Sequence, residues 1–406
     1  MGDREERHIP NPFPKTLAAD SIKVVDPSIG QLSADFVKNL QKSADSLLKK
    51  LEREIDSNID WGDTSIYTGC CGYSLLYLHL ADILGDDIYL QKAQPLMERC
   101  LKKMKGKRSS FLCGDAGPLA VAAVVFSKLN MKKEMANCIQ GLKKLERDVL
   151  NPSSGLPDEI LYGRAGYLYA LLFLQREIGK DAVHDQTIHA VVEAILDSGR
   201  ALARHEKSRS PLMYEWHEKK YIGAAHGIMG ILFMLLQVKE YLNDKELQEK
   251  IKPTIDYMCS LQFPSGNMPS SLGNKTDRLI HWCHGAPGGV FLFAKAYEVF
   301  GNQSYLDQAK KCAECVWERG LLWKGYGLCH GTAGNGYALL YMYQVTKDTE
   351  YLYQAAQFAR WCQDYGTHRC RTPDRPMSLF EGLAGTIYFL TDLTNPESAK
   401  FPAFVI

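Results

Sequence analysis

Hydrophobic residues occur in two kinds of segment that alternate along the chain. In one kind nearly every position is apolar, as in residues 73–80, 167–174, 228–236 and 337–343. Such a pattern is typical of a helix that is buried on all sides. In the other kind, apolar positions recur at helical spacing opposite a charged face. Seven segments have this second pattern: residues 33–55, 89–104, 132–150, 188–205, 246–261, 304–320 and 350–365. The alternation predicts amphipathic outer helices, buried inner helices and little β-sheet.

A short glycine signature precedes each apolar segment. Gly-x-x-Gly occurs at seven places, with its first glycine at Gly69, Gly114, Gly163, Gly227, Gly285, Gly331 and Gly382. The intervals of 45, 49, 64, 58, 46 and 51 residues indicate one repeated supersecondary unit. We therefore predict an all-α fold, an α/α-toroid of fourteen helices built from seven outer–inner helical hairpins. In this prediction residues 33–406 form a single domain with a C-terminal tail, and residues 1–32 form an N-terminal arm.

The glycines also suggest how the inner helices begin. Small residues allow the N-termini of these helices to crowd together at one end of the ring. We expect them to leave backbone N–H groups uncovered there, and helix N-termini of this kind favour anions and thiolates.

Two of the seven repeats carry potential metal ligands. Cys283 and Cys329 each lie two residues before the first glycine of their repeat, and a histidine follows each, His284 or His330. Because repeats five and six are neighbours, these side chains should converge at one end of adjacent inner helices. Two cysteines and one histidine leave the fourth position of a zinc ion open, as in catalytic sites. Buried free cysteines are the alternative, and spacing alone does not decide between His330 and His284.

The other cysteines suggest structural roles. The chain has 12 cysteines and lacks the apolar core of a signal peptide at its N-terminus, so we expect reduced thiols rather than disulfides. Cys312 and Cys315 form a Cys-x-x-Cys pair within a predicted outer helix, where side-chain packing is the favoured interpretation. Cys70, Cys71 and Cys113 are interpreted as small apolar residues at the start of other repeats.

Charge and composition exclude several classes of partner. The chain has 48 basic and 47 acidic residues, so no electrostatic property favours nucleic acid or an anionic membrane. No stretch approaches the ~18–20 apolar residues of a membrane span. Gly2 could accept a myristoyl group, but position 6 is Glu6 instead of the serine or threonine of that signal. We expect a cytoplasmic protein, and the N-terminus does not support peripheral membrane association.

The repeat motifs resemble those of a known family. They are Ala225-His226-Gly227, His281-Trp282-Cys283-His284-Gly285 and Gly327-Leu328-Cys329-His330-Gly331. In these features the chain resembles the LanC-like proteins, eukaryotic relatives of the bacterial lanthionine cyclases, over nearly its whole length. The resemblance implies an α/α-toroid, one zinc ion held by Cys283, Cys329 and His330, and glutathione as the bound thiol. It also implies glutathione contacts at Lys324 and at Arg371, Thr372, Pro373 and Asp374.

The resemblance further implies a reaction, the addition of glutathione to dehydroalanine or dehydrobutyrine in proteins, or to electrophilic small molecules. Such an addition forms an enolate that must be stabilised and protonated. His226 and Lys324 are the candidate acids, because histidine exchanges protons readily near neutral pH, while Lys324 follows mainly from the resemblance. His226 could instead be a structural residue that bonds a helix end.

Further charged residues are candidates for substrate binding. Asp115 and Arg164 take the second position of their glycine signatures, so they either orient catalytic groups and bind substrate carboxylates or pair with each other. Arg371 could bind a glutathione carboxylate as a bidentate fork, with Asp374 at the ammonium group. Arg7 in the N-terminal arm is a further candidate of the same kind.

Two other functions compete with this interpretation. A non-catalytic scaffold could hold zinc and glutathione and bind signalling proteins, but structural zinc normally takes four protein ligands. A subunit of a zinc-dependent protein prenyltransferase would predict an Asp-Cys-His ligand set, whereas this chain carries paired Cys-His-Gly motifs.

Overall fold

The computed structural model describes residues 7–15, 24–26, 30–104, 106 and 108–406. Gly2 and Glu6, on which the myristoylation argument depends, lie outside these residues. The chain divides into two compact units. We call Met1–Asn58 with Gln262–Phe401 the first unit, and Ile59–Leu261 with Pro402–Ile406 the second unit. The extent of the domain predicted over residues 33–406 stays a prediction.

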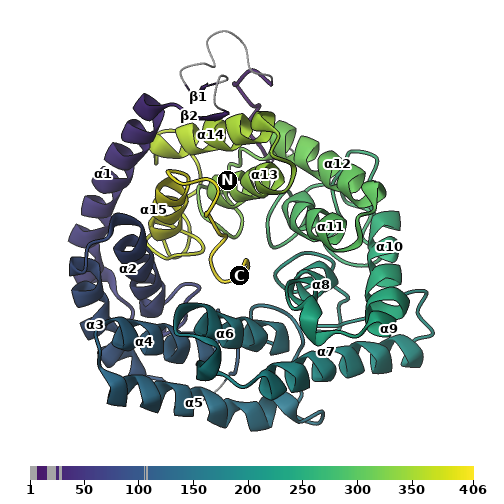
Figure 1. The fold of residues 1–406 in the computed structure, drawn as a ribbon. Coiled ribbons are helices and arrows are strands. Elements are labelled where there is room, and N and C mark those ends of the chain that lie inside the picture. The colour runs from purple at the N-terminus through teal and green to yellow at the C-terminus, as the bar shows by residue number, and fades with distance from the viewer. Residues whose placement is uncertain (1–6, 16–23, 27–29, 105, 107) are drawn as a thin grey trace. The chain divides into compact units, whose positions relative to one another are not determined.

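The second unit alternates two layers of helices (Figure 1). The apolar segments form α2 (Cys70–Leu84), α4 (Ala116–Lys128), α6 (Arg164–Glu177) and α8 (Ile228–Gln237), which are buried over most of their length. The amphipathic segments form α3 (Ile88–Leu101), α5 (Lys132–Leu150) and α7 (Asp185–His205), which pack on the buried helices. Short 3₁₀ turns cover Lys180–Ala182 and Lys239–Tyr241.

The predicted outer helix over residues 246–261 is interrupted in the structure. It consists of α9 (Asp244–Glu246), a π-helical turn (Leu247–Ile251) and α10 (Lys252–Ser260). Asn243 and Glu246 form a capping box at the start of α9, which fixes where the helix begins.

The first unit has the same alternation. Its buried helices are α11 (Ala286–Phe300), α13 (Thr332–Thr346) and α15 (Leu383–Asp392), and its outer helices are α1 (Ala34–Asn58), α12 (Gln303–Arg319) and α14 (Thr349–Gln363). Helix α11 packs on α12 and α13, and α15 packs on α1 and α13. Strands β1 (Val25–Asp26) and β2 (Gln31–Leu32) form one antiparallel pair, the only named strands among the described residues. The all-α prediction is confirmed.

The prediction that the inner helices begin with uncovered N–H groups is wrong. A residue in the first turn donates to the carbonyl seven positions upstream, at 2.8–3.1 Å, in most repeats. Examples are Cys70 to Asp63, Arg164 to Pro157, Ile228 to Tyr221, Thr332 to Gly325 and Leu383 to Pro376. The loop before each helix therefore folds back and caps the helix with its own carbonyls, so these N–H groups are not open to a ligand.

This folded-back loop explains the glycine signature. A Cβ atom on Gly334, the second glycine of repeat six, would lie 1.8 Å from the carbonyl oxygen of Leu328. Only glycine allows the loop to lie this close to the helix. The same loop carries Cys329, so the glycine and the candidate metal ligand belong to one structural unit.

The expectation that the cysteines are reduced is wrong at one place. Cys70 and Cys100 form a disulfide, in which Cys70 opens α2 and Cys100 lies in the last turn of α3. Helices α2 and α3 pack against each other, so residues separated by 30 positions in sequence become neighbours. Cys70 is therefore a cross-linked residue and not merely a small apolar one.

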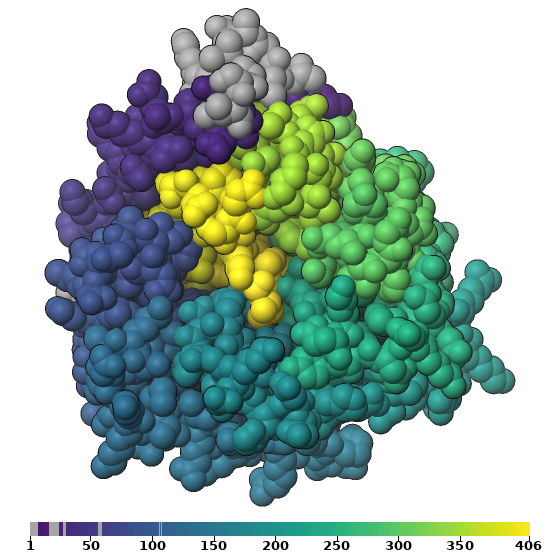
Figure 2. Space-filling model, in the orientation of Figure 1, coloured from purple at the N-terminus to yellow at the C-terminus, as the bar shows by residue number. Residues whose placement is uncertain are grey.

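The C-terminal residues fold onto the second unit. Phe404 stacks on Phe233 of α8 with ring centroids 4.4 Å apart, and the Ala403 N–H donates to the Tyr169 hydroxyl. Figure 2 shows one face of the molecule, with the C-terminal part of the chain in yellow. Among the described residues, none of the helices is both long and apolar enough to cross a membrane.

Candidate metal centre

The structure brings Cys283, Cys329 and His330 together in the first unit. Their ligand atoms all lie within 4.8 Å of one another. Cys283 precedes α11 and Cys329 precedes α13, and these two helices pack together. The Cys283 N–H donates to the Cys329 carbonyl at 3.3 Å, so the two loops are joined directly. We call these three residues the Cys-Cys-His centre.

Without a cation, burial at the Cys-Cys-His centre favours the neutral thiol of Cys329 over the thiolate. Burial raises the pKa of the Cys329 thiol well above its usual value, and Cys283 adds to this rise. Burial lowers the pKa of His330, but the neighbouring Cys329 outweighs it and the net pKa is raised. A thiolate at this depth is stable beside a positive charge. Two thiols and one imidazole match the donor set of a zinc ion with three protein ligands.

Two other histidines lie near the Cys-Cys-His centre. His281 Nδ1 is 3.9 Å from Cys283 Sγ, and the His281 N–H donates to the His284 carbonyl. Burial lowers the pKa of His281 well below its usual value, and nearby positive charges act in the same direction, so its ring is neutral. Among the described residues, the group of three potential metal ligands contains His330. It does not contain His284, the other histidine that the spacing allowed.

The loop before α11 is held in a different way from the other loops. The Ala286 N–H does not reach the carbonyl of Leu279, seven positions upstream, but donates to Asn267 Oδ1 at 2.7 Å. Asn267 Nδ2 donates in turn to the Leu279 carbonyl at 3.2 Å. The Asn267 side chain is therefore inserted between the helix and its loop, and Cys283 lies in the segment between these two contacts.

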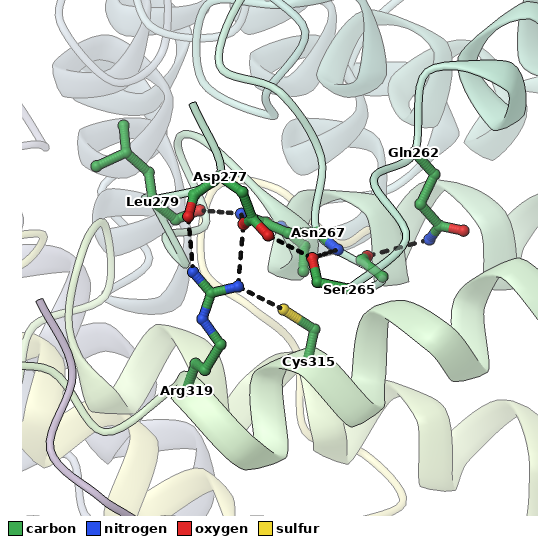
Figure 3. Close-up of polar contacts among 9 residues, drawn as sticks. Gln262, Ser265, Asn267, Asp277, Leu279, Cys315 and Arg319 are labelled. Atoms are coloured by element: carbon green, nitrogen blue, oxygen red, sulfur yellow. Dashed lines mark hydrogen bonds and ion pairs between the residues drawn. The ribbon is translucent and has the colours of Figure 1, made fainter. Parts of the chain in front are cut away.

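Further residues hold Asn267 in place (Figure 3). Its Nδ2 donates to Asp277 Oδ1 at 2.8 Å, and Arg319 from α12 donates to the same oxygen at 3.0 Å and to the Asp277 backbone carbonyl at 2.9 Å. Asn267 is fully buried, whereas Asp277 and Arg319 are partly exposed. This network anchors the loop that carries Cys283, and the sequence analysis missed it because its members belong to no motif.

Three of the predicted glutathione contacts gather around one short segment of the first unit. Trp323 donates its N–H to the Arg7 carbonyl at 3.2 Å and accepts the Arg371 N–H at 2.8 Å. Lys324 follows Trp323 directly, and the charges of Lys324 and Arg7 both act on His281. A cationic group therefore lies next to the Cys-Cys-His centre.

The predicted segment 371–374 is a loop of this unit. Arg371 forms an ion pair with Asp374 at 2.9 Å, and both side chains are exposed. Thr372 is exposed and Pro373 is half-buried in the same loop. An exposed ion pair is held weakly, so a ligand could replace it at little cost.

His226 belongs to the second unit and has an acidic partner. Its Nδ1 lies 2.8 Å from Glu159 Oε2, and Glu159 is 1% exposed. The backbone N–H groups of Leu161 and Tyr162 donate to the same carboxylate, which fixes its position. Glu159 is a functional candidate that the sequence analysis missed, because 67 residues separate it from His226.

The alternative of an ion pair between Asp115 and Arg164 is wrong. Arg164 pairs with Asp158 at 2.8 Å and donates to the carbonyls of Val149, Leu156 and Asn151, and it is 4% exposed. Its guanidinium N–H groups donate to the loop before α6. We therefore do not retain Arg164 as a glutathione contact. Asp115 is 7% exposed and lines a cavity of the second unit.

The chain is similar to known proteins in sequence and in fold. Residues 60–406 match the family described as lanthionine synthetase C-like protein. The chain is 44% identical over 404 residues to a Danio rerio protein named glutathione S-transferase LANCL1, covering 99% of this chain and 100% of that one. The solved structure of nisin cyclase is similar with a TM-score of 0.66 at 16% identity, over 89% of this chain and 95% of that one. The fold is therefore shared with nisin cyclase, which confirms the predicted α/α-toroid class.

Proposed function

The chain belongs to the lanthionine synthetase C-like family, and from this premise we propose that it is a zinc-dependent glutathione transferase. The proposed reaction adds the glutathione sulfur to electron-poor alkenes, chiefly dehydroalanine and dehydrobutyrine in proteins, and forms a thioether. The observation that carries the proposal is the convergence of Cys283, Cys329 and His330 within 4.8 Å. The name of the Danio rerio relative, a glutathione S-transferase, supports glutathione as the thiol.

Cys283, Cys329 and His330 would hold the zinc ion, with one coordination position left for the thiol. The chemistry that a bound zinc ion supplies is stabilisation of the glutathione sulfur as a thiolate. His281, neutral and 3.9 Å from Cys283 Sγ, adds no positive charge of its own beside the cysteines. The network of Asn267, Asp277 and Arg319 keeps the Cys283 loop in position.

The cationic group around Trp323 would bind the rest of glutathione, which carries two carboxylates and one ammonium group. Lys324, Arg371 and Arg7 supply positive charges for the carboxylates, and Arg371 can bind one of them through two parallel hydrogen bonds. Asp374 would exchange its ion pair with Arg371 for the ammonium group. Thr372 and Pro373 complete the binding loop.

His226 would protonate the enolate that follows the addition. Glu159 holds His226 Nδ1 at 2.8 Å, which orients the imidazole so that Nε2 is directed away from the carboxylate. Lys324 is the alternative acid.

Mass spectrometry of a dehydroalanine-containing peptide tests the proposal. With glutathione and the protein present, we expect the peptide to gain the mass of one glutathione much faster than with glutathione alone. A matched control is the Cys138→Ala variant, which removes a buried cysteine of α5 outside the Cys-Cys-His centre and should retain the activity. If the protein binds glutathione and zinc but does not accelerate the addition to any dehydroamino acid, a non-catalytic scaffold becomes the better account.

A further inference from the structure

The second unit contains a cavity that the proposed function has not used. It has a volume of about 180 Å³ and lies between the loop before α2 and the loop before α4. Asp63, Thr64, Ser65, Arg108, Cys113 and Asp115 are among its lining residues. A single buried water needs only about 10–15 Å³ by the same measure, so the cavity can admit an organic group.

Among the described residues that line this cavity, Arg108 is the cationic one. Its guanidinium stacks over the Tyr162 ring, 4.3 Å from the ring centroid. Among the described residues it makes no side-chain hydrogen bond or ion pair, so its N–H donors are available to a ligand. Asp63, in contrast, already accepts hydrogen bonds from the Ser65 N–H and the Thr68 hydroxyl. A ligand in the cavity would therefore meet the donors of Arg108.

Tyr162 links Arg108 to His226. The Tyr162 and His226 rings stack with centroids 5.9 Å apart and planes 14° apart. The backbone N–H of Tyr162 donates to Glu159, the carboxylate that also holds His226. The Tyr162 ring therefore lies between the Arg108 guanidinium, whose N–H donors are available, and the imidazole of His226, the proposed proton donor.

We propose that this cavity is the electrophile site, and that Arg108 donates hydrogen bonds to the carbonyl oxygen of an α,β-unsaturated acyl substrate such as a dehydroalanine residue. The inference rests on the proposed function and adds the residue that stabilises the enolate. The thiolate sulfur forms a bond to the β-carbon, and the π electron pair moves onto the carbonyl oxygen beside Arg108. A proton from His226 then forms the C–H bond at the α-carbon. Solvent returns a proton to the imidazole and receives the one that the thiol lost, so the net reaction adds S–H across the double bond.

The charges around the cavity favour a carbonyl over a carboxylate as the ligand. Asp63 and Asp115 line the cavity with Arg108, so among the described lining residues an anionic ligand would meet two carboxyl groups and a single guanidinium. A carbonyl is neutral when it binds and gains negative charge only as the carbon–sulfur bond forms. Arg108 would then interact more strongly with the transition state than with the substrate, which is the condition for catalysis.

Kinetics of Arg108 variants test the inference. With a dehydroalanine peptide of neutral flanking residues, we expect kcat/KM of Arg108→Gln to fall roughly ten- to a hundredfold, the usual loss of a charged hydrogen bond. Arg108→Lys, which keeps the charge, should lose less. The matched control is Arg99→Gln, because Arg99 also stacks on an aromatic ring, Trp61 at 3.6 Å, but does not line the cavity. Equal kcat/KM in Arg108→Gln and Arg99→Gln would overturn the inference. So would a loss that appears only with acidic flanking residues, because Arg108 would then bind a substrate carboxylate.

A binding measurement separates this inference from the proposed function. Calorimetry would use an unreactive peptide with alanine in place of dehydroalanine, and we expect about tenfold weaker binding to Arg108→Gln than to wild type or Arg99→Gln. If peptide binding depends on Arg108 but wild type transfers no glutathione, the result supports the peptide site and contradicts the transferase function. If wild type transfers glutathione but neither peptide binding nor kcat/KM changes in Arg108→Gln, the result supports the transferase function and contradicts the role of Arg108.

Discussion

Each unit of the chain contains a group of three potential metal ligands, and the two groups differ in chemistry. In the first unit, the Cys-Cys-His centre lies near the positive charges of Lys324 and Arg7. In the second unit, Cys70, Cys71 and Cys100 also bring their sulfur atoms within 4.8 Å of one another. We call these three residues the three-cysteine cluster. A disulfide joins Cys70 to Cys100, so two of its three sulfurs are unavailable as thiolates.

The surroundings of the two groups strengthen the difference. Burial raises the pKa of Cys71 well above its usual value, and the negative charges of Asp63 and Asp115 raise it further. All three cysteines of the cluster are at most 1% exposed, whereas His330 is partly exposed and can meet a substrate. Three clustered ligands are therefore not enough for a metal site: we infer that the oxidation state of the sulfurs and the exposure of one ligand to solvent decide.

The largest effect should follow from Cys329→Ala. Removal of one of three protein ligands should abolish both the bound zinc and the glutathione transfer. The helices should stay folded, because apolar packing stabilises a core of this size without the metal. Elemental analysis and circular dichroism of the purified variant check these outcomes. Full zinc occupancy in Cys329→Ala would remove the distinction between the two groups.

A smaller but still large effect is expected from His226→Asn. If His226 protonates the enolate, turnover on a dehydroalanine peptide should fall by about two to four orders of magnitude. Zinc content and glutathione affinity should stay near wild type, since the residues proposed for both belong to the first unit. Unchanged turnover would move the acid role to Lys324. A fall in thermal stability with a proportionate loss of activity would make His226 a structural residue.

Asn267→Ala tests whether the network shown in Figure 3 supports the Cys-Cys-His centre. Loss of residues that orient metal ligands typically costs ten- to a hundredfold in metal affinity. We expect a loss of that size in competition with a zinc chelator. Asn302→Ala is the matched control, because Asn302 caps α12 and its loss should lower stability by about 1 kcal/mol without a change in zinc affinity. Equal zinc affinities in the two variants would show that Asn267 does not hold the Cys283 loop.

Arg371→Ala tests the cationic group beside the Cys-Cys-His centre. Loss of one charge-assisted contact should cost about 1.5–3 kcal/mol, roughly ten- to a hundredfold in glutathione affinity. Calorimetric titration with glutathione measures the change. If the affinity of Arg371→Ala equals that of wild type, the carboxylate of glutathione is bound elsewhere.

The smallest effect on the metal is expected from Cys100→Ala. Zinc content and turnover should stay at the wild-type level, because the three-cysteine cluster holds no metal in this account. Loss of the disulfide should lower the free energy of unfolding by about 2–4 kcal/mol in urea under non-reducing conditions. If the variant does not fold, zinc analysis of wild type after mild reduction of the disulfide serves instead. A second zinc ion that appears on reduction would contradict the comparison.

The sequence allowed prediction of the helices, and it drew attention to Cys283 and Cys329, for clear physical reasons. Buried and amphipathic helices differ in periodicity, and the glycine signature marks where each inner helix begins. Cys283 and Cys329 could be found because both take the same position in adjacent repeats. The choice between His330 and His284 needed the structure, since only the fold shows which imidazole approaches the two sulfurs.

Contacts between residues far apart in the sequence could not be predicted from the sequence. Glu159 and Asn267 lie outside the repeated signatures, so their bonds to His226 and Ala286 leave no local pattern. Arg164 was misassigned because its place in a signature does not tell where its side chain points. In the structure it folds back onto the loop before α6 and pairs with Asp158.

The central claim is that glutathione transfer depends on a zinc ion at the Cys-Cys-His centre. The most direct measurement is the rate of glutathione addition to a dehydroalanine peptide by wild-type protein stripped of zinc and then titrated with it. The account predicts almost no addition by the stripped protein and a rate that rises in proportion to zinc until one ion per chain is bound. A stripped protein that adds glutathione as fast as the zinc-loaded protein would contradict the account.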